Sequence, residues 1–243
     1  MSESKYNLSN AKFGGGFAEG TQIGGTLNDY STNNITDKNS ENPETNTADI
    51  KTILVLAANP KTTSRLRLDE EVREIDAGLQ RARKREAFDL QFDLQVRWAV
   101  RVRDVSQALL DFKPQIVHFC GHGGDDGLAL EDETGRVQYV STAALAELFE
   151  LFSPKNNQNQ KNIECVILNA CYSEAQATAI SQYIPYVIGM NKAIGDKAAI
   201  EFVVGFYSAL VAGESIDFAY KLGCNAIAMA GIPENLTPIL KVK

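Results

Sequence analysis

Two short segments of the sequence carry side chains that could act together as a nucleophile and a base. Cys171 ends the segment Leu168-Asn-Ala-Cys171, and His118 and His122 both lie in the segment His118-Phe-Cys-Gly-His122. A cysteine thiolate can attack a carbonyl carbon when an imidazole manages the protons and backbone N–H groups receive the developing oxyanion. Because the chain contains only these 2 histidines, any Cys-His pair must use the second segment.

Each of these segments begins within a predicted buried strand and continues past its carboxyl end. Residues 116–120 and 165–168 are short apolar runs, as expected for strands that are covered on both faces. Ligands of open α/β sheets bind beyond the carboxyl ends of the strands. Cys171 lies between its strand and a predicted helix at 174–183, near a helix N-terminus, a location that lowers a thiol pKa. We favour His122, at the open strand end, as the base, and expect mid-strand His118 to be packed or hydrogen-bonded inside.

Gly123 follows His122 directly and lets the backbone approach a substrate closely. We therefore predict the N–H groups of Gly123 and Cys171 as the oxyanion donors. Cysteine is among the most buried residue types, and a structural role is predicted for the remaining cysteines, Cys120, Cys165 and Cys224.

Metal binding is an alternative use of the histidine segment. His118, Cys120 and His122 stand at i, i+2 and i+4 and would share one face of a strand. The sequence lacks a paired Cys-x-x-C and a His-x-x-x-His on a helix, the usual accompaniments of a zinc site. We therefore predict no metal and no cofactor.

Strand and helix patterns alternate along the chain from residue 51. The alternation predicts an α/β fold with a mostly parallel sheet and helices on both of its faces. The predicted strands are residues 53–58, 88–96, 116–120, 165–168 and 186–190, with a further strand at 238–242 and a small hairpin at 128–139. The predicted helices are residues 66–84, 102–112, 142–152, 174–183, 196–212 and 215–229.

The charge and cysteine content exclude several classes of protein. A formal net charge of −7 and a pI near 5.0 argue against nucleic acid as the main partner, because phosphate binding requires a basic surface. No apolar run reaches the ~18 residues of a membrane span, and we predict no stable membrane insertion. No secretory signal is visible, and 4 cysteines in such a chain indicate reduced thiols. We therefore expect a cytoplasmic protein.

Four segments resemble the CHAT domains, a bacterial branch of the caspase and separase clan. They are Ile-Leu-Val-Leu-Ala-Ala-Asn-Pro at 53–60, Leu-Arg-Leu-Asp-Glu-Glu-Val-Arg-Glu-Ile at 66–75, Val-His-Phe-Cys-Gly-His-Gly-Gly at 117–124 and Val-Ile-Leu-Asn-Ala-Cys-Tyr-Ser at 166–173. The resemblance covers about residues 51–230 and implies a caspase-like domain over 51–243. It also implies endopeptidase activity on a protein substrate, with His122 as catalytic base and Cys171 as nucleophile.

The resemblance leaves the substrate preference open. In the related metacaspases, an acidic residue two positions before the cysteine helps to bind a basic P1 side chain, and here that position is Asn169. Asp125 and Asp126 are further candidates for the pocket, although both are also ordinary turn residues before Gly127.

Two other readings of the domain remain. The first is a non-catalytic caspase-like module that only assembles with partners. The second is a nucleotide-binding flavodoxin-like or Rossmann-like domain, which the first loop (residues 59–63) does not favour because it lacks the Gly-x-Gly-x-x-Gly pattern.

Residues 1–50 differ in composition from the rest of the chain. They are rich in Asn, Thr, Ser and Gly and poor in Leu and Val, which predicts disorder in the free monomer. Within residues 1–30, however, Phe13, Phe17 and Ile23 are spaced among Gly and Asn, and stacked in-register strands could bury them in a dry zipper. A plain flexible linker is the alternative, and residues 31–50 are predicted to be a linker in both cases.

Gln22-Ile23-Gly24 resembles the core of the RIP homotypic interaction motif and related amyloid signalling motifs. The resemblance implies that residues 1–30 self-assemble and that a nucleotide-binding receptor carries a matching motif. It also implies that the chain is an effector in regulated cell death or immunity, activated when its tail is recruited.

Overall fold

The computed structural model describes residues 49–83, 90–156 and 162–243. All of them belong to the larger of two compact units into which the chain divides, Thr45–Lys243. The predicted assembly motif at 1–30, with Phe13, Phe17, Gln22, Ile23 and Gly24, lies outside the described residues, as do residues 31–48 of the predicted linker. Among the described helices, none is both long and apolar enough to cross a membrane.

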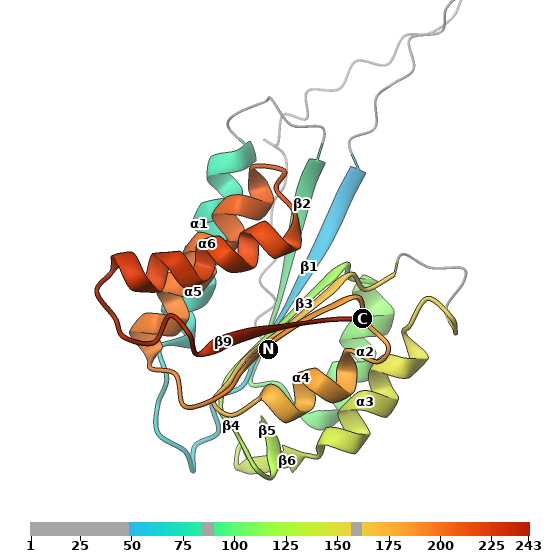
Figure 1. Ribbon diagram of the computed structural model, residues 1–243. Helices are drawn as coiled ribbons and strands as arrows, with labels where there is room; N and C mark the ends of the chain where they lie inside the picture. Colours follow the sequence, from blue (N-terminus) through green and yellow to red (C-terminus); the bar gives the residue numbers. More distant parts are fainter. Residues whose placement is uncertain (1–48, 84–89, 157–161) are drawn as a thin grey trace, which may run out of the picture. The chain divides into compact units, whose positions relative to one another are not determined.

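A six-stranded sheet forms the centre of this unit, in the order β2-β1-β3-β7-β8-β9 (Figure 1). The first five strands are mutually parallel, and β9 runs antiparallel to β8. The strands span β1 Asp49–Ala57, β2 Leu90–Trp98, β3 Ile116–Cys120, β7 Cys165–Asn169, β8 Tyr186–Met190 and β9 Pro238–Val242.

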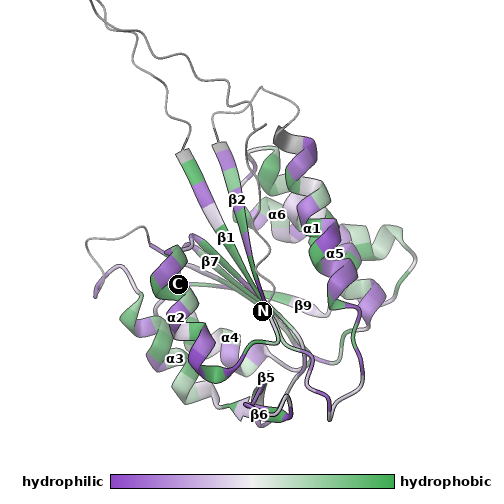
Figure 2. Ribbon diagram, turned by 180° about the vertical axis from the view of Figure 1, so that it is seen from behind, coloured by the Kyte–Doolittle hydropathy of each residue, from purple (hydrophilic) through white to green (hydrophobic). Residues whose placement is uncertain are grey.

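The middle strands are apolar because both of their faces are covered. Every residue of β3 and β7 is buried, which explains why these segments read as continuous apolar runs. In β1, alternate residues serve two separate cores: Ile53 and Val55 belong to one, and Leu54 and Leu56 to the other. Figure 2 shows hydrophobic residues concentrated in these central strands, between two groups of helices.

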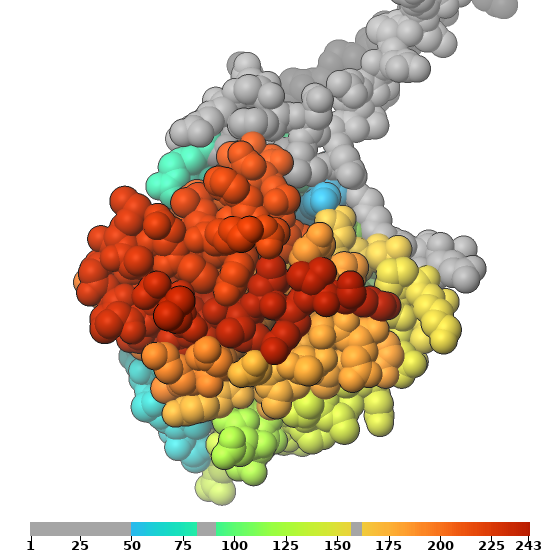
Figure 3. Space-filling view, viewed as in Figure 1, coloured from blue at the N-terminus to red at the C-terminus, as the bar shows by residue number. Residues whose placement is uncertain are grey.

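Helices cover both faces of the sheet and contribute the other half of each core. On one face lie α1 (Leu68–Arg83), α5 (Asp196–Val211) and α6 (Ile216–Met229), and on the other α2 (Val102–Phe112), α3 (Thr142–Leu151) and α4 (Glu174–Ile180). At the antiparallel edge, β9 forms part of the surface between α6 and α4 (Figure 3).

Local sequence signals fix several helix ends. The side chains of Ser141 and Ser215 accept hydrogen bonds from the backbone N–H groups at the starts of α3 and α6. Helix α2 ends at Lys113, which adopts the left-handed conformation (φ 46°) directly before a proline that cannot continue the helix.

A second, three-stranded antiparallel sheet follows β3 directly. It consists of β4 (Gly123–Gly124), β5 (Gly127–Glu131) and β6 (Val137–Val140). Gly127 has φ +118°, and a Cβ there would lie 2.0 Å from the Val140 carbonyl oxygen, so the turn between β4 and β5 requires glycine. The chain therefore passes from the carboxyl end of β3 almost directly into this second sheet.

The predicted α/β fold, with a mostly parallel sheet between helices, is confirmed. The predicted strands, helices and hairpin are all present among the described residues, with ends that differ by a few residues. Two features were not predicted: the antiparallel direction of β9 and the short strand β4, whose two glycines carry no strand pattern.

Candidate active site

The two segments singled out in the sequence leave the sheet side by side. Strands β3 and β7 are parallel neighbours, and their last residues, Cys120 and Asn169, are paired in register. The backbone N–H of Gly121 donates to the Asn169 carbonyl oxygen across 3.3 Å, so the contact continues beyond the strands. His122 and Cys171 each follow two residues after this pair. Both therefore lie at the carboxyl edge, where open α/β sheets bind ligands.

Cys171 occupies the turn between β7 and α4, as predicted. Its thiol is half-buried, and its Sγ lies 3.5 Å from the Ile194 N–H, which donates to it, and 3.7 Å from the Ile194 carbonyl oxygen. The two main-chain groups of Ile194 therefore hold the sulfur in place at the edge of the sheet.

The three remaining cysteines are less suited to nucleophilic chemistry. Cys120 and Cys165 are fully buried, and burial raises the pKa of both thiols. Burial also raises the pKa of Cys224 on α6. A raised pKa keeps these thiols protonated and unreactive, as the sequence predicted for structural cysteines.

Tyr172, the residue after Cys171, adopts the left-handed conformation with φ 54°. This conformation is uncommon for a residue with a bulky side chain and concentrates at functional sites. The Tyr172 N–H donates to the Lys192 carbonyl oxygen across 3.3 Å, which helps to hold the turn. The turn thus brings Cys171 out of the strand and leaves the Tyr172 side chain 51% exposed beside it.

The His122 ring is held by a main-chain carbonyl. Its Nε2 lies 2.7 Å from the carbonyl oxygen of Ser64, in the loop before α1. A carbonyl oxygen only accepts, so Nε2 carries a proton. In the neutral ring, Nδ1 is then the nitrogen with the free lone pair, which can act as a base.

Gly123 allows the two segments to touch. A Cβ at Gly123 would lie 2.6 Å from the Cys171 carbonyl oxygen and 3.0 Å from the Ala170 Cβ, so the backbones pack closely where no side chain would fit. The contact is independent of the strand register and confirms that the His122 and Cys171 segments adjoin each other.

The pairing of β4 with β5 shows where the Gly123 N–H points. The Ala129 N–H donates to the His122 carbonyl oxygen across 3.0 Å, and Gly123 stands opposite Leu128. Hydrogen-bonded and non-hydrogen-bonded pairs alternate along an antiparallel ladder, so the Gly123–Leu128 pair is non-hydrogen-bonded. The Gly123 N–H therefore points away from β5. Among the described residues, no acceptor is found for the Cys171 N–H either.

His118 lies inside the domain, as predicted. It is fully buried, its Nε2 lies 2.8 Å from Glu71 Oε1, and its Nδ1 lies 3.0 Å from the Tyr207 hydroxyl. Asn169 joins the same buried network: its Nδ2 donates to Glu71 Oε1 across 2.7 Å. Burial raises the pKa of Tyr207 well above its ordinary value, so its hydroxyl remains protonated and can donate to His118.

The predicted pocket residues do not share one surface. Asp125 and Asp126 are exposed in the turn after β4, whereas Asn169 is only 4% exposed and points into the Glu71 network. The reason is the alternation of side chains along β7, which turns Asn169 towards the core under α1. A role for each of the three in substrate binding stays a prediction, but the structure does not group them.

The potential metal ligands also differ from the predicted set. Donor atoms of Glu71, His118 and Cys120 lie within 4.8 Å of one another in the described part of the chain. His122, the third residue of the predicted alternative, is instead bonded to Ser64. Both ring nitrogens of His118 already have hydrogen-bond partners, so His118 would have to give up one of them to bind a metal ion.

Sequence reasoning did not identify Ser64, Glu71 or Tyr207 as residues near the site. For Glu71 a signal was present: it stands three residues after Leu68 and four before Ile75, on the apolar stripe of α1. A charged residue on that stripe requires a buried partner. Ser64 acts through its backbone, which has no signature in the sequence.

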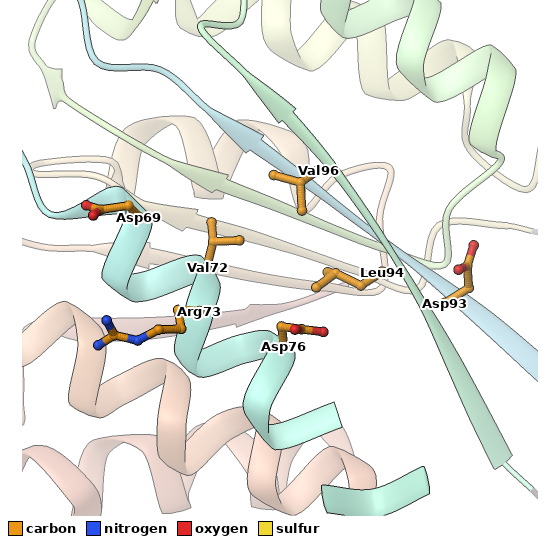
Figure 4. A pocket seen from close by; sticks show the side chains of 7 residues that line it. All are labelled: Asp69, Val72, Arg73, Asp76, Asp93, Leu94 and Val96. Carbon is orange, nitrogen blue, oxygen red and sulfur yellow. The ribbon is translucent and has the colours of Figure 1, made fainter. Parts of the chain in front are cut away.

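Two hollows adjoin β2 without including any predicted site residue. One of about 570 Å³ lies between α1 and β2, with Asp69, Val72, Arg73 and Asp76 on the helix side and Asp93, Leu94 and Val96 on the strand side (Figure 4). The other, of about 280 Å³, lies at the carboxyl ends of β1 and β2 and includes Asn59, Arg65 and Trp98. The second hollow opens at the edge where β3 and β7 also end.

The sequence and the fold are similar to those of known proteins. A "Probable protease" from Gillisia limnaea is 28% identical over 188 residues, which are 76% of this chain and 31% of the relative. A "Roc-COR-CHAT protease" from an unknown prokaryotic organism is 24% identical over 186 residues, 76% of this chain and 17% of the relative. The chain thus spans less than a third of the length of either curated relative.

Among solved structures, the arginine-specific cysteine proteinase gingipain R is similar in fold. The TM-score is 0.50 at 10% sequence identity, and the match covers 76% of this chain and 43% of gingipain R. At this identity the likeness concerns the fold alone. The family profile of the CHAT domain matches residues 25–221. That match covers most of the sequence, and the chain therefore belongs to the CHAT domain family.

Proposed function

We propose that the chain is a cysteine endopeptidase in which His122 and Cys171 form the catalytic pair. The observation that carries the proposal is the close backbone contact between Gly123 and Cys171 at the ends of two register-paired strands. It supports a placement of the imidazole and the thiol at one edge of the sheet. The two curated relatives that are described as proteases support the same class of activity.

In this proposal His122 acts through Nδ1, because Nε2 is bonded to Ser64. Nδ1 takes the proton of the Cys171 thiol, and the thiolate attacks the scissile carbonyl carbon to form a C–S bond. The imidazolium is stabilised by the Ser64 carbonyl oxygen, which accepts from Nε2–H. The developing oxyanion receives hydrogen bonds from the N–H groups of Gly123 and Cys171.

Collapse of the tetrahedral intermediate breaks the C–N bond, and the leaving amine takes the proton from His122 Nδ1. A water molecule then gives a proton to Nδ1 and attacks the thioester. The second collapse breaks the C–S bond, releases the carboxylic acid and returns the proton to Cys171.

Substitution of the two residues tests the assignment. Cys171→Ala is expected to abolish peptide hydrolysis, and His122→Ala to lower kcat by about 10²- to 10⁴-fold, the usual contribution of a general acid-base. Cys224→Ser is the matched control, since Cys224 is a half-buried thiol on α6 whose pKa burial raises. Full hydrolysis by Cys171→Ala would overturn the catalytic pair, whereas a wild-type chain without any hydrolysis would favour a module that only assembles with partners.

We also propose that residues 1–30 recruit the peptidase into assemblies. The support is the pattern of Phe13, Phe17 and Gln22-Ile23-Gly24 among glycines and polar residues. A receptor with a matching segment would gather several chains, which raises the local concentration of the peptidase without any new contact in the domain. In this proposal the chain is an effector of regulated cell death or immunity.

A further inference from the structure

A single buried carboxylate oxygen joins the two strands that carry the proposed catalytic pair. Glu71 Oε1 lies 2.8 Å from His118 Nε2 on β3 and accepts from Asn169 Nδ2 on β7 across 2.7 Å. Glu71 and Asn169 are each 4% exposed and His118 is fully buried. Hydrogen bonds to an ionised group are short and strong, so this oxygen constrains both donors together.

Both donors belong to strands that lead directly to the catalytic edge: His118 is the middle residue of β3, and Asn169 is the last residue of β7. His118 precedes His122 by four residues, and Asn169 precedes Cys171 by two. A change in the distance between His118 and Asn169 would therefore also move His122 and Cys171 relative to each other. Glu71 also stands in the first turn of α1, seven residues after Ser64, whose carbonyl oxygen holds His122 Nε2. Residues 64–71 thus make two contacts with this part of the chain: Glu71 bonds His118 on β3, and Ser64 bonds His122 just beyond it.

The Glu71 carboxyl group stands where the rest of the buried stripe of α1 is apolar. Its neighbours on the buried stripe of α1 are Leu68, Val72 and Ile75, and an apolar side chain would fill this place without the desolvation cost of a carboxylate. A buried carboxylate with two directed partners restrains geometry, which an apolar side chain cannot do.

We propose that Glu71 is a positioning residue, which holds β3 and β7 at the spacing that brings His122 Nδ1 to the Cys171 sulfur. This inference rests on the proposed function, because it assigns a role in the reaction of that pair. Glu71 itself touches neither the substrate nor the reacting atoms. It acts through His118 and Asn169.

Four variants of the full chain test this role. Glu71→Leu removes the shared acceptor, whereas Glu71→Gln keeps an amide oxygen that can accept from both donors. Leu79→Ala creates a cavity on the same buried face of α1, further from the catalytic edge, and reports general destabilisation. Glu74→Gln makes the same chemical change as Glu71→Gln at a partly exposed residue, whose ion-pair partner among the described residues is Arg73 on the same helix.

Kinetics at a temperature well below each variant's Tm give the first result. Glu71→Leu is expected to lower kcat by about 10²-fold, the effect of a small displacement between reacting groups. Glu71→Gln should recover most of that loss, and Leu79→Ala and Glu74→Gln should keep kcat near the wild-type value.

If Glu71→Leu does not fold, Asn169→Ala breaks one of the two links. A positioning role for Asn169 predicts a lower kcat with little change in KM. A role in the substrate pocket predicts a higher KM.

The imidazole signals give a readout that does not depend on turnover. The chain has 2 histidines, so each ring can be assigned in an NMR spectrum. Glu71→Leu is expected to shift the signals of His122, which Glu71 does not contact, as well as those of His118. Leu79→Ala should leave the His122 signals in place.

The outcomes separate this inference from the proposed function. If the wild type shows no hydrolysis that depends on Cys171, the proposed function fails and the positioning role falls with it. If the wild type is active and Glu71→Leu keeps the kcat of Leu79→Ala, only the positioning role is wrong. Stoichiometric zinc that is lost in Glu71→Leu would also overturn it, because Glu71 would then be a ligand with His118 and Cys120.

Discussion

At the scale of single residues, contacts made by the backbone shape this site as much as side chains do. The Ser64 carbonyl oxygen determines which nitrogen of His122 carries the proton, and the missing Cβ of Gly123 determines how near the two segments approach. Both effects would be lost by changes that leave His122 and Cys171 themselves in place. A survey of reactive side chains alone would miss them.

Gly123 and its neighbour Gly124 provide a matched test of this close approach. A methyl group at Gly123 would lie 2.6 Å from the Cys171 carbonyl oxygen, whereas a Cβ at Gly124 would meet nothing within 4 Å. We expect Gly123→Ala to lower kcat by about 10²-fold, because the two segments must separate. Gly124→Ala should retain activity. Peptide hydrolysis by the two purified variants checks this, and equal activities would contradict the backbone contact.

The residues of the site were predictable to different degrees. Cys171 and His122 could be placed at one edge of the sheet because each follows a recognisable apolar strand and the chain offers only 2 histidines. Glu71 stands in the acidic first turn of α1, where a charge also complements the helix dipole, and its burial depends on how α1 packs on the sheet. The inward turn of Asn169 depends on the same packing.

At the scale of elements, the start of α2 shows how a charged pair orders a helix end. Asp104 accepts from the Arg101 backbone N–H across 3.0 Å and from its side-chain Nε across 2.8 Å. The hydrogen bond from the Arg101 side chain is the main cause that lowers the pKa of Asp104. A carboxyl group with a lowered pKa in the folded state stabilises the fold above its unfolded pKa, and that contribution is lost as the pH falls through the folded value.

We therefore expect Asp104→Asn to lower the free energy of unfolding by about 1 kcal/mol at pH 7, as the loss of a helix cap does. The difference from wild type should shrink from pH 7 to pH 2, because the contribution of the Asp104 charge is lost as the pH falls through its lowered pKa. Urea unfolding at the two pH values checks this. Asp111→Asn near the end of the same helix is the control, since removing a negative charge there should not destabilise the helix. A difference that stays as large at low pH would contradict the role of the charge.

The order of the elements followed from the sequence more readily than their direction did. Runs such as residues 116–120 and 165–168 predicted buried strands because length and hydrophobicity are local properties. The antiparallel course of β9 is not local: the chain reaches it from α6, and only the packing of the two helices decides from which end it enters the sheet.

At the scale of the whole molecule, the proposed assembly of residues 1–30 would connect recruitment to catalysis. We expect Ile23→Asp to prevent thioflavin-positive fibrils of the full chain, because a charge cannot be stacked in register inside a dry zipper. Thr36→Asp, the same added charge in the predicted linker, should leave fibril formation unchanged. Thioflavin fluorescence and sedimentation of the purified chains check this.

Assembly should also raise the rate of peptide hydrolysis per chain. Hydrolysis per chain is expected to rise with protein concentration in the wild type and to remain constant in Ile23→Asp, because only assembled chains gain local concentration. A wild-type chain that never forms fibrils would leave residues 1–30 as a flexible linker. Equal rates per chain for the two proteins would mean that assembly does not affect catalysis.

The in-register pairing of Cys120 with Asn169 has a consequence for how this site can change during evolution. His122 and Cys171 both stand two positions past that pair, and each step along a strand reverses the side of the sheet that a side chain faces. A one-codon insertion inside either strand would therefore send one of the two to the opposite side, while the core would lose its apolar pattern as well. Changes in chain length should therefore accumulate in the loops that join the strands and helices, while β3 and β7 keep a fixed length.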